Sequence, residues 1–212
     1  HGTSHQYVAG VTAELLEKDI KDLNIITCHL GNGASITAIK GGKCINTSMG
    51  LTPLGGIMMG SRSGDIDPTV VFYMMKKLNC TPDEMDTYLN KKSGMLGVSG
   101  ISSDARDVEE AAKNGNERAI LTQELYVNRV INVLGGYVMQ LGHVDAISFT
   151  AGLGENDAAM REKILKAASE SLGLSIDYDL NATIHGKQAR ISKDDSKVAV
   201  FVIPTNEEVV IA

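Results

Sequence analysis

The sequence predicts an α/β fold, in which a mixed sheet is flanked by helices within a single domain over residues 1–212. Short apolar runs with strand character alternate with longer amphipathic segments. Two of these runs flank an Asn-Gly turn, a hairpin signal that requires an antiparallel pair. Glycine makes up about a tenth of the chain, against a usual ~7%, and it gathers between the runs. Many loops therefore need backbone angles that other residues rarely adopt.

The first element is an amphipathic helix that continues to Lys18. Thr3 and Gln6 have the T-x-x-Q spacing of a capping box, which predicts that this helix begins near Thr3. His1 and Gly2 then lie just ahead of a helix N-terminus, where backbone N–H groups favour an anion. His5, by contrast, is expected to be packed or solvated rather than functional.

Strands follow over residues 24–30 and 34–40, joined by a tight turn at 31–33. A second turn, K-G-G-K, leads to a short strand over residues 44–48. Two interpretations of the turn Gly31, Asn32 and Gly33 remain open. The turn can serve only to close the hairpin, or its glycines can let backbone amides meet a phosphate group.

A stretch over residues 47–68 holds five glycines around a single arginine, Arg62. The guanidinium offers a planar fork of donors that suits carboxylate or phosphate oxygens, and Gly60 and Gly64 would let the backbone approach a bound group. The alternative is a long surface loop with a solvated arginine. Asp67 and Pro68 then open a helix as its N-cap and first helical residue.

That helix ends near Asn79, and Thr81 opens a short one. Residues 93–100 are expected to form a glycine-rich loop, which leads to a helix over residues 102–114 with an acidic first turn. Asp104 and Arg106 lie in that turn, where helix capping and a local ion pair are the simplest roles.

A long helix is predicted over residues 116–142, with one apolar face for the core. Gly135 and Gly136 inside it cost roughly 1 kcal/mol each relative to alanine, which predicts a kink or close packing by another backbone. The apolar face consists of Ile120, Leu121, Leu125, Val130, Leu134, Val138 and Leu141.

The last part of the chain predicts a buried strand over 144–150, a turn over 151–156, a helix from Asp157 and a buried strand over 197–204. Thr205 and Glu208 have the spacing of a further capping box. The chain starts without methionine and stops soon after that box, so we expect it to be part of a longer protein.

Composition limits the classes of partner. With 20 basic and 26 acidic residues, the net charge of -6 argues against nucleic acid. No apolar run approaches the ~20 residues of a membrane span, and no signal peptide is visible. Cys28, Cys44 and Cys80 are odd in number and lack C-x-x-C spacing, so we expect a reducing, cytoplasmic setting without a disulfide or zinc framework.

Six motifs occur in an order that resembles the acetate and propionate kinase family, and specifically its C-terminal domain. They are H-G-T-S-H, H-L-G-N-G-A-S, the Arg62 motif T-P-L-G-G-I-M-M-G-S-R-S-G-D-I-D-P, S-G-I-S-S-D-A-R-D, T-A-G-L-G-E-N and I-P-T-N-E-E. The resemblance covers essentially the whole chain. It implies the ribonuclease-H-like fold shared by acetate and sugar kinases, heat-shock ATPases and actin.

The resemblance also implies a reaction. The γ-phosphoryl group of ATP passes reversibly to acetate, which gives acetyl phosphate and ADP, with Mg²⁺ as the metal and a homodimer as the assembly. A propionate or butyrate kinase, and a non-catalytic actin-like nucleotide-binding module, are the alternatives. The family's N-terminal domain is absent from the chain, so we expect the chain alone to bind nucleotide weakly and to transfer no phosphoryl group.

Residue roles follow from the same resemblance. His1 and Arg62 match groups that stabilise the phosphoryl group during transfer, and Pro53 matches a wall of the acetate methyl pocket. Glu207 matches the acidic residue associated with magnesium, although its position alone fits an ordinary first-turn helix carboxylate. The residues implied to bind the nucleotide are His29, Leu30, Gly31, Asn32, Gly33, Asp104, Ala105, Arg106, Gly152, Leu153, Gly154, Glu155 and Asn156.

Overall fold

The computed structural model describes residues 1–205 of the chain. It divides the chain into two compact units, each of which is described by itself. Unit 1 consists of residues 1–48 together with the chain from Val130 onward, and unit 2 consists of residues 49–129. Unit 2 therefore interrupts unit 1 in the sequence.

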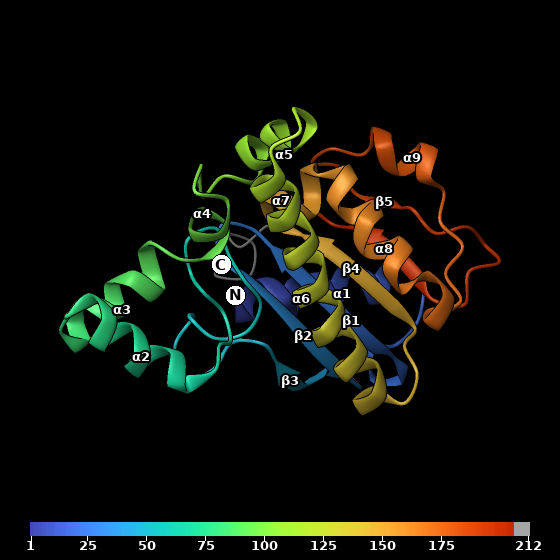
Figure 1. Cartoon of the computed structure of the whole chain (residues 1–212). Coiled ribbons are helices and arrows are strands. Elements are labelled where there is room, and N and C mark those ends of the chain that lie inside the picture. Colours follow the sequence, from blue (N-terminus) through green and yellow to red (C-terminus); the bar gives the residue numbers. More distant parts are fainter. Residues whose placement is uncertain (206–212) are drawn as a thin grey trace. The chain divides into compact units, whose positions relative to one another are not determined.

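Unit 1 contains a six-stranded sheet in the order β3-β2-β1-β4-β6-β5 (Figure 1). β1 pairs antiparallel with β2 and parallel with β4, which in turn pairs parallel with β6. The predicted mixed sheet and the predicted hairpin are therefore confirmed. The strands are β1 (Asn24–Leu30), β2 (Ala34–Lys40), β3 (Lys43–Thr47), β4 (Ala146–Thr150), β5 (Ala189–Arg190) and β6 (Ala199–Val202).

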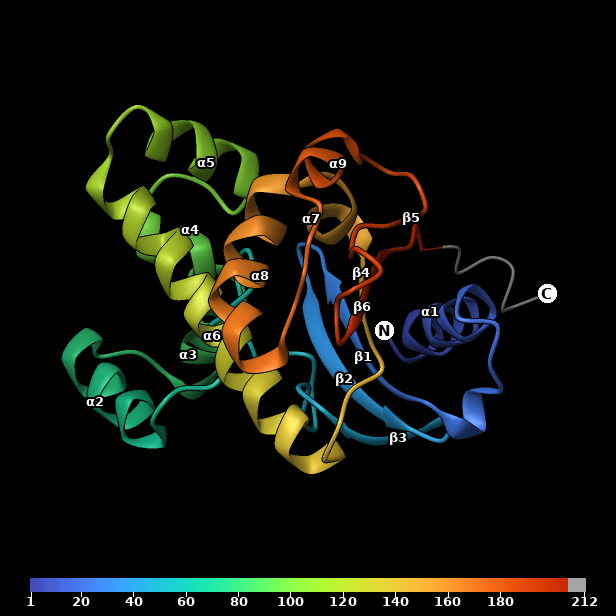
Figure 2. The ribbon, with the colours of Figure 1, turned by 90° about the vertical axis from the view of Figure 1, so that its right-hand side faces the viewer.

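Helices cover both faces of the sheet at strands β1, β4 and β6, with α1 (Gly2–Leu15) and α8 (Ala158–Leu172) on opposite sides (Figure 2). Successive side chains of a strand point to opposite faces of the sheet, so a nearly uninterrupted apolar strand has apolar side chains on both faces, and both faces can be buried. On the α1 side, Val8 packs in a cluster with Ala146 and Phe201, while Ala9 packs in another with Ile25. The opposite set is equally buried: Ile26, Cys28, Ile147, Phe149, Val200 and Val202.

The start of α1 differs from the prediction. Its first backbone hydrogen bond runs from His5 N to His1 O, so His1 is the N-cap and the helix begins at Gly2. Thr3 therefore lies inside the first turn, and the predicted Thr3–Gln6 capping box is wrong. The helix also ends earlier than predicted, at Leu15, because Glu17 adopts a left-handed conformation with φ 54°.

Unit 2 is helical. It contains α2 (Pro68–Leu78), α3 (Pro82–Lys91), α4 (Gly94–Ser99), α5 (Ala105–Lys113) and the first half of α6 (Glu117–Leu141). The predicted caps are confirmed, since Asp67 accepts a hydrogen bond from Thr69 N and Thr81 forms a capping box with Glu84. Residues 93–100 do not form a simple loop as expected, because they contain α4, which Gly100 ends in the left-handed conformation.

The long helix α6 is confirmed, but its predicted apolar face is partly wrong. Ile120 and Leu121 are 39% and 53% exposed. The buried face follows a three- to four-residue spacing that includes Thr122 and two tyrosines. Because these residues carry polar atoms, a search for apolar residues alone did not find this face. Gly135 and Gly136 have no atom within 4 Å of an added Cβ among the described residues, so the expected close packing is not found. The buried positions are Ala119, Thr122, Gln123, Tyr126, Val130, Leu134, Tyr137 and Leu141.

Three shorter helices complete the described part of the chain: the 3-10 helix η1 (Ile20–Asp22), α7 (Ala151–Asn156) and α9 (Tyr178–Thr183). The sequence pattern did not reveal η1 or α9. Within residues 1–205, no helix is both long enough and apolar enough to span a membrane.

Candidate active site

Two of the predicted glycine loops lie side by side in unit 1. β1 and β4 are parallel neighbours, with His29 in register with Thr150, so the chain leaves both strands at the same edge of the sheet. A Cβ placed at Gly31 would lie 3.5 Å from Ala151 Cβ. Residues 31–33 and 151–156 therefore border one region beyond the carboxyl ends of the strands, which is where ligands bind in open α/β sheets.

The turn at residues 31–33 is not the hairpin turn that Asn-Gly usually signals. A type I′ turn needs positive φ at both central residues, and none of these three residues has it. A side chain at Gly31 would be crowded, because its Cβ would lie 3.1 Å from Gly33 O. The phosphate-binding interpretation of this turn stays a prediction.

Residues 151–156 form the short helix α7 rather than the expected turn. The Oε1 atom of Glu155 accepts hydrogen bonds from Ala151 N at 2.8 Å and from Thr205 N at 2.9 Å, which satisfies an N–H group at the start of the helix. Ala151 is buried in a left-handed conformation, with φ 65°. Such a conformation costs about 1–3 kcal/mol outside glycine and often occurs at functional sites.

Three histidines cluster next to these loops. The ring of His1 lies 4.0 Å from that of His29, centroid to centroid, and His5 lies 6.0 Å from His29. Ser35 Oγ is within 2.7 Å of both His1 Nδ1 and His5 Nε2, and Ser4 Oγ is 2.9 Å from His29 Nδ1. His5 and His29 are buried, whereas His1 is exposed.

Burial keeps two of these rings neutral at physiological pH. It lowers the pKa of His5 to about 3, with a further contribution from His29, and it lowers the pKa of His29 to about 4. A neutral imidazole carries one N–H group and one acceptor nitrogen. His5 therefore donates one of its two hydrogen bonds and accepts the other, while His29 is bound at Nδ1 by Ser4.

These two histidines should make the fold sensitive to acid. Their folded pKa values lie below the ordinary 6.5, so between the folded values and 6.5 the unfolded chain binds more protons. The contribution of these histidines to the free energy of unfolding is then fully present above pH 6.5, and it is lost as the pH falls toward their folded pKa values of about 4 and about 3. We expect each histidine to lower the free energy of unfolding by about 2 kcal/mol between pH 7 and pH 5.

Urea unfolding at pH 7 and pH 5 measures this loss. His5→Gln should remove roughly half of the pH dependence, whatever it does to stability at pH 7. An unchanged difference between the two pH values in this variant would contradict the assignment to His5.

In unit 2, Arg62 lies in a closed loop next to Pro53. Its Nη1 atom donates to Pro53 O at 3.3 Å and lies 3.8 Å from Met59 Sδ. Within residues 1–205, Nε and Nη2 have no hydrogen bond, so their three N–H groups remain for oxygen ligands. Gly64 has φ 67°, and its Cβ would meet Gly56 O at 2.5 Å. Gly64 therefore lets the loop fold on itself, rather than admitting a ligand as expected.

The Arg62 loop is held by the start of α4. Met95 N donates to Met59 O, and Leu96 N donates to Gly60 O, each at 2.9 Å. Gly94 has φ 62°, and a Cβ there would fall on Met59 O and lie 2.7 Å from Arg62 O. Since both atoms are backbone, no side-chain rotation can relieve the clash.

Gly94→Ala should therefore displace Arg62. Gly115→Ala is its matched control, because Gly115 has φ 83° but no atom within 4 Å of an added Cβ. The control should cost only the left-handed backbone strain of about 1–2 kcal/mol, whereas Gly94→Ala adds overpacking of about 1–3 kcal/mol. Melting temperatures of the two variants test the difference. Equal losses would show that backbone strain alone matters at Gly94.

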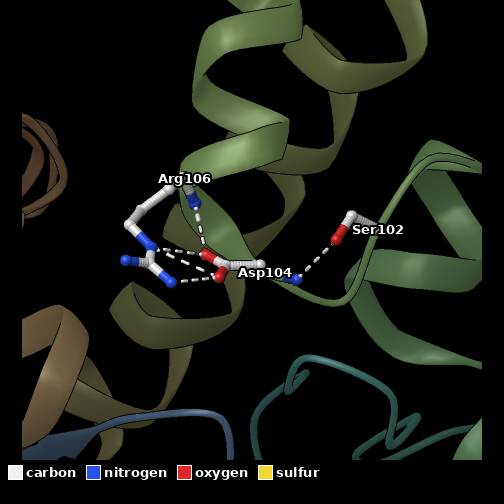
Figure 3. A network of polar contacts seen from close by, with 3 residues as sticks. All are labelled: Ser102, Asp104 and Arg106. Atoms are coloured by element: carbon white, nitrogen blue, oxygen red, sulfur yellow. Dashed lines mark hydrogen bonds and ion pairs between the residues drawn. The ribbon is translucent and has the colours of Figure 1, made fainter.

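Asp104 and Arg106 take the simple roles that their positions suggest (Figure 3). Asp104 caps α5 by accepting from Arg106 N at 2.9 Å, and its carboxylate pairs with the Arg106 guanidinium at 2.6 Å. Hydrogen bonds from Arg106 hold the pKa of Asp104 below its usual range. The pair is exposed, so it contributes little to stability, and its guanidinium face remains open to a ligand.

The predicted metal residue, Glu207, lies outside the described residues, as does Glu208 of the predicted capping box. Within residues 1–205, no group of three or more His, Cys, Asp or Glu could hold a metal ion. Mg²⁺ typically takes only one or two carboxylates from protein and completes its shell with water and substrate phosphates. The described residues are therefore compatible with a magnesium site supplied mainly by a bound nucleotide.

Sequence reasoning missed several residues that shape the site. His5 is packed, as one of the two expectations for it had it, but its place in a hydrogen-bonded chain had no sequence signal. Ser35, Thr27 and Ser4 carried no signal of their own, because small hydroxyl residues are common in strands and helices. The role of Gly94 can be recognised only in the structure, where an added Cβ would clash with the backbone at Met59.

Glycine loops at the carboxyl ends of parallel strands, beside a histidine cluster, define an α/β protein whose loops lie at the edge of the sheet where open α/β sheets bind ligands. A model of the acetokinase family matches residues 1–212. The chain therefore belongs to the acetokinase family.

Individual relatives agree with this assignment. An acetate kinase of Clostridium botulinum (strain Okra / Type B1) is 58% identical over 212 residues, which cover 100% of this chain and 53% of the relative. The crystal structure of Porphyromonas gingivalis acetate kinase matches with a TM-score of 0.96 and 47% identity, covering 100% of this chain and 53% of that one. A propionate kinase from Francisella tularensis matches with a TM-score of 0.92 and 40% identity, over the same shares.

These likenesses confirm the predicted family and fold class. The chain spans about half the length of the curated relatives it matches.

Proposed function

We propose that the chain is the C-terminal nucleotide-binding domain of a two-domain acetate kinase, a cytoplasmic phosphotransferase. The observation that carries the proposal is the placement of His1 and His29, 4.0 Å apart between ring centroids, beside two glycine loops at the ends of β1 and β4. The family match over residues 1–212 and the acetate kinases among the relatives support the same reaction.

In this reaction a carboxylate oxygen of acetate attacks the γ-phosphorus of ATP. A new P–O bond forms to acetate, and the bond between the γ-phosphorus and the bridging oxygen breaks, which leaves acetyl phosphate and ADP. Such transfer depends mainly on positioning and on neutralising charge. Arg62 supplies a permanent positive charge and the open N–H groups of Nε and Nη2 for the equatorial oxygens, and His1 supplies one hydrogen-bond donor.

The remaining predicted residues hold the substrates. The turn at Gly31–Gly33 meets the phosphates, while Asp104–Arg106 and Gly152–Asn156 hold the nucleoside. Glu155 contributes by fixing α7, because its Oε1 atom is turned toward Ala151 N and Thr205 N. Pro53 borders the acetate methyl group, and Glu207 would hold Mg²⁺, which neutralises charge on the β- and γ-phosphates.

The test uses the full-length protein, meaning this chain together with the N-terminal domain that the family possesses. Incubation with acetate, ATP and Mg²⁺ in the presence of hydroxylamine should yield acetyl hydroxamate. Absence of product at saturating acetate would refute the proposal.

A propionate kinase is the second candidate, because a propionate kinase is among the structural relatives at 40% identity. The methyl pocket is only partly formed by Pro53. Comparison of kcat/KM for acetate, propionate and butyrate separates the candidates, since one methylene group in a pocket is worth ~1–3 kcal/mol.

We also propose a homodimer formed through this domain. The predicted interface is α6, whose solvent-facing side includes Leu121 at 53% and Met139 at 82% exposure. Gly135 and Gly136 of the same helix leave room for a close backbone.

Without the N-terminal domain, the chain should bind ADP weakly and form no acetyl phosphate, because the facing half of the cleft aligns the substrates.

A further inference from the structure

A chain of three short hydrogen bonds ends at His1. Thr27 Oγ1 lies 2.6 Å from His5 Nδ1, His5 Nε2 lies 2.7 Å from Ser35 Oγ, and Ser35 Oγ lies 2.7 Å from His1 Nδ1. The participants come from β1, α1 and β2. Thr27 and Ser35 are fully buried, and His5 is 4% exposed. The interior of unit 1 therefore fixes one ring nitrogen of an exposed histidine.

The hydrogen bonds in this chain must all run in the same direction. His5 is neutral, so it donates from one nitrogen and accepts at the other. The single hydroxyl proton of Ser35 then points either to His1 or to His5. In both arrangements Nδ1 of His1 is engaged, and Nε2 is the ring nitrogen with no hydrogen bond among residues 1–205.

A second, parallel arrangement holds the neighbouring ring. Ser4 Oγ lies 2.9 Å from His29 Nδ1 and 3.1 Å from Thr205 Oγ1. His29 therefore also has Nδ1 bound to a serine hydroxyl. Two adjacent histidine rings, tilted by 37° and both held at Nδ1 by serines, leave both Nε2 atoms available for one substrate.

We propose that Ser35 and His5 are positioning residues that hold His1 by Nδ1, so that Nε2 faces the phosphoryl group during transfer. This inference rests on the proposed kinase function. His1 precedes the first helical residue and is exposed, so its ring is restrained by the Ser35 hydrogen bond and by contact with the His29 ring. Without the hydroxyl of Ser35, the ring would sample other rotamers and both neutral tautomers. Groups that orient a functional histidine commonly contribute 10- to 100-fold, as is known from metal sites, and small misplacements cost about as much.

The decisive variant is Ser35→Ala in the full-length enzyme. We expect kcat to fall roughly 10- to 100-fold while KM for acetate and for ATP stays within about threefold, because the hydroxyl positions His1 without touching substrate. Ser35→Thr keeps a hydroxyl and should recover most of the loss. A kcat within twofold of the parent enzyme in folded Ser35→Ala would overturn the proposal.

Thr27→Val and Thr37→Val provide a matched pair that does not depend on Ser35. Thr27 and Thr37 are directly paired residues of β1 and β2, and both are buried. Thr37 bonds to Thr47 at 2.9 Å and lies outside the chain. Thr27→Val should lower kcat, whereas Thr37→Val should not. If Ser35→Ala does not fold, this pair decides, and equal kcat values would overturn the proposal.

A spectroscopic measurement separates this inference from the proposed reaction. Donation from Nε2 requires the arrangement in which Ser35 donates to His1 Nδ1. In the parent protein, ¹⁵N NMR of the His1 ring should therefore show the Nε2–H form as the dominant neutral tautomer, which becomes a mixture in Ser35→Ala and stays unchanged in Thr37→Val. A mixture already present in the parent protein would overturn the proposal. Failure of the proposed function would instead appear as a parent enzyme that makes no acetyl phosphate while the tautomer remains fixed.

Discussion

Arg62→Ala in the full-length enzyme should lower kcat by roughly 10²–10³-fold and leave the affinity for ATP within a few-fold. The guanidinium already donates to Pro53 O, and Nε and Nη2 remain open among the described residues. In the transition state, charge is spread over the three equatorial oxygens of the phosphoryl group, and the proposed role of this side chain is to stabilise that charge. Steady-state kinetics and calorimetric titration with ADP measure the two effects.

Two variants define what the result means. Arg62→Lys keeps the charge but loses the planar fork, so it should recover only part of the rate. Arg106→Ala removes an exposed arginine of α5 and should raise KM for ATP with little effect on kcat. Equal losses of kcat and ATP affinity in Arg62→Ala would instead favour a non-catalytic nucleotide-binding module of the actin type.

Arg161→Met should destabilise the fold by about 3–5 kcal/mol. Arg161 lies on α8 and is completely buried. Its guanidinium donates to Gly154 O at 3.0 Å, to Asn181 Oδ1 at 2.8 Å and to Ile184 O at 2.8 Å. Burial lowers its pKa to about 10, so it stays charged at neutral pH. Methionine fills similar volume but leaves these buried acceptors without a donor.

Calorimetry of the full-length protein measures the loss, which corresponds to a fall in melting temperature on the order of 10 °C. Arg190→Met is the control, because that side chain is 41% exposed and pairs with Asp194 at 3.7 Å, so its loss should stay within ~0.5 kcal/mol. A melting temperature of Arg161→Met that matches the control would show that other donors replace the guanidinium.

The sheet could be predicted because its signals are local. Short apolar runs marked β1, β2 and β4, and side chains directly before α2 and α3 marked their caps. The short helices α4 and α7 could not be predicted, since glycines hide their periodicity. α7 further depends on Glu155 bonding to Thr205, 50 positions away, and no local pattern contains that contact.

The candidate site divides in the same way. Arg62 and the glycine loops stand out because the chemistry of each lies within a few consecutive residues. Ser35 and Thr27 form hydrogen bonds with His5, from which they are separated by 30 and 22 positions. Only the pairing of β1 with β2, and the docking of α1 on the sheet, bring them together. Local motifs therefore reveal the candidate ligand-binding groups, whereas the hydrogen-bond partners of those groups emerge only from the tertiary structure.

The interruption of unit 1 by unit 2 has a consequence for synthesis of the chain on the ribosome. β1, β2 and β3 are made early, but the strands that complete the sheet, β4 and β6, come only after all of unit 2. At ordinary translation speeds this delay is on the order of ten seconds. Throughout it, one edge of β1 lacks its partner, and an unpaired apolar edge is a template for aggregation. Unit 2 is continuous in sequence, so it can fold during that interval. The nascent hairpin of β1 and β2 must stay soluble until β4 is made, and slower translation lengthens the time in which it can aggregate.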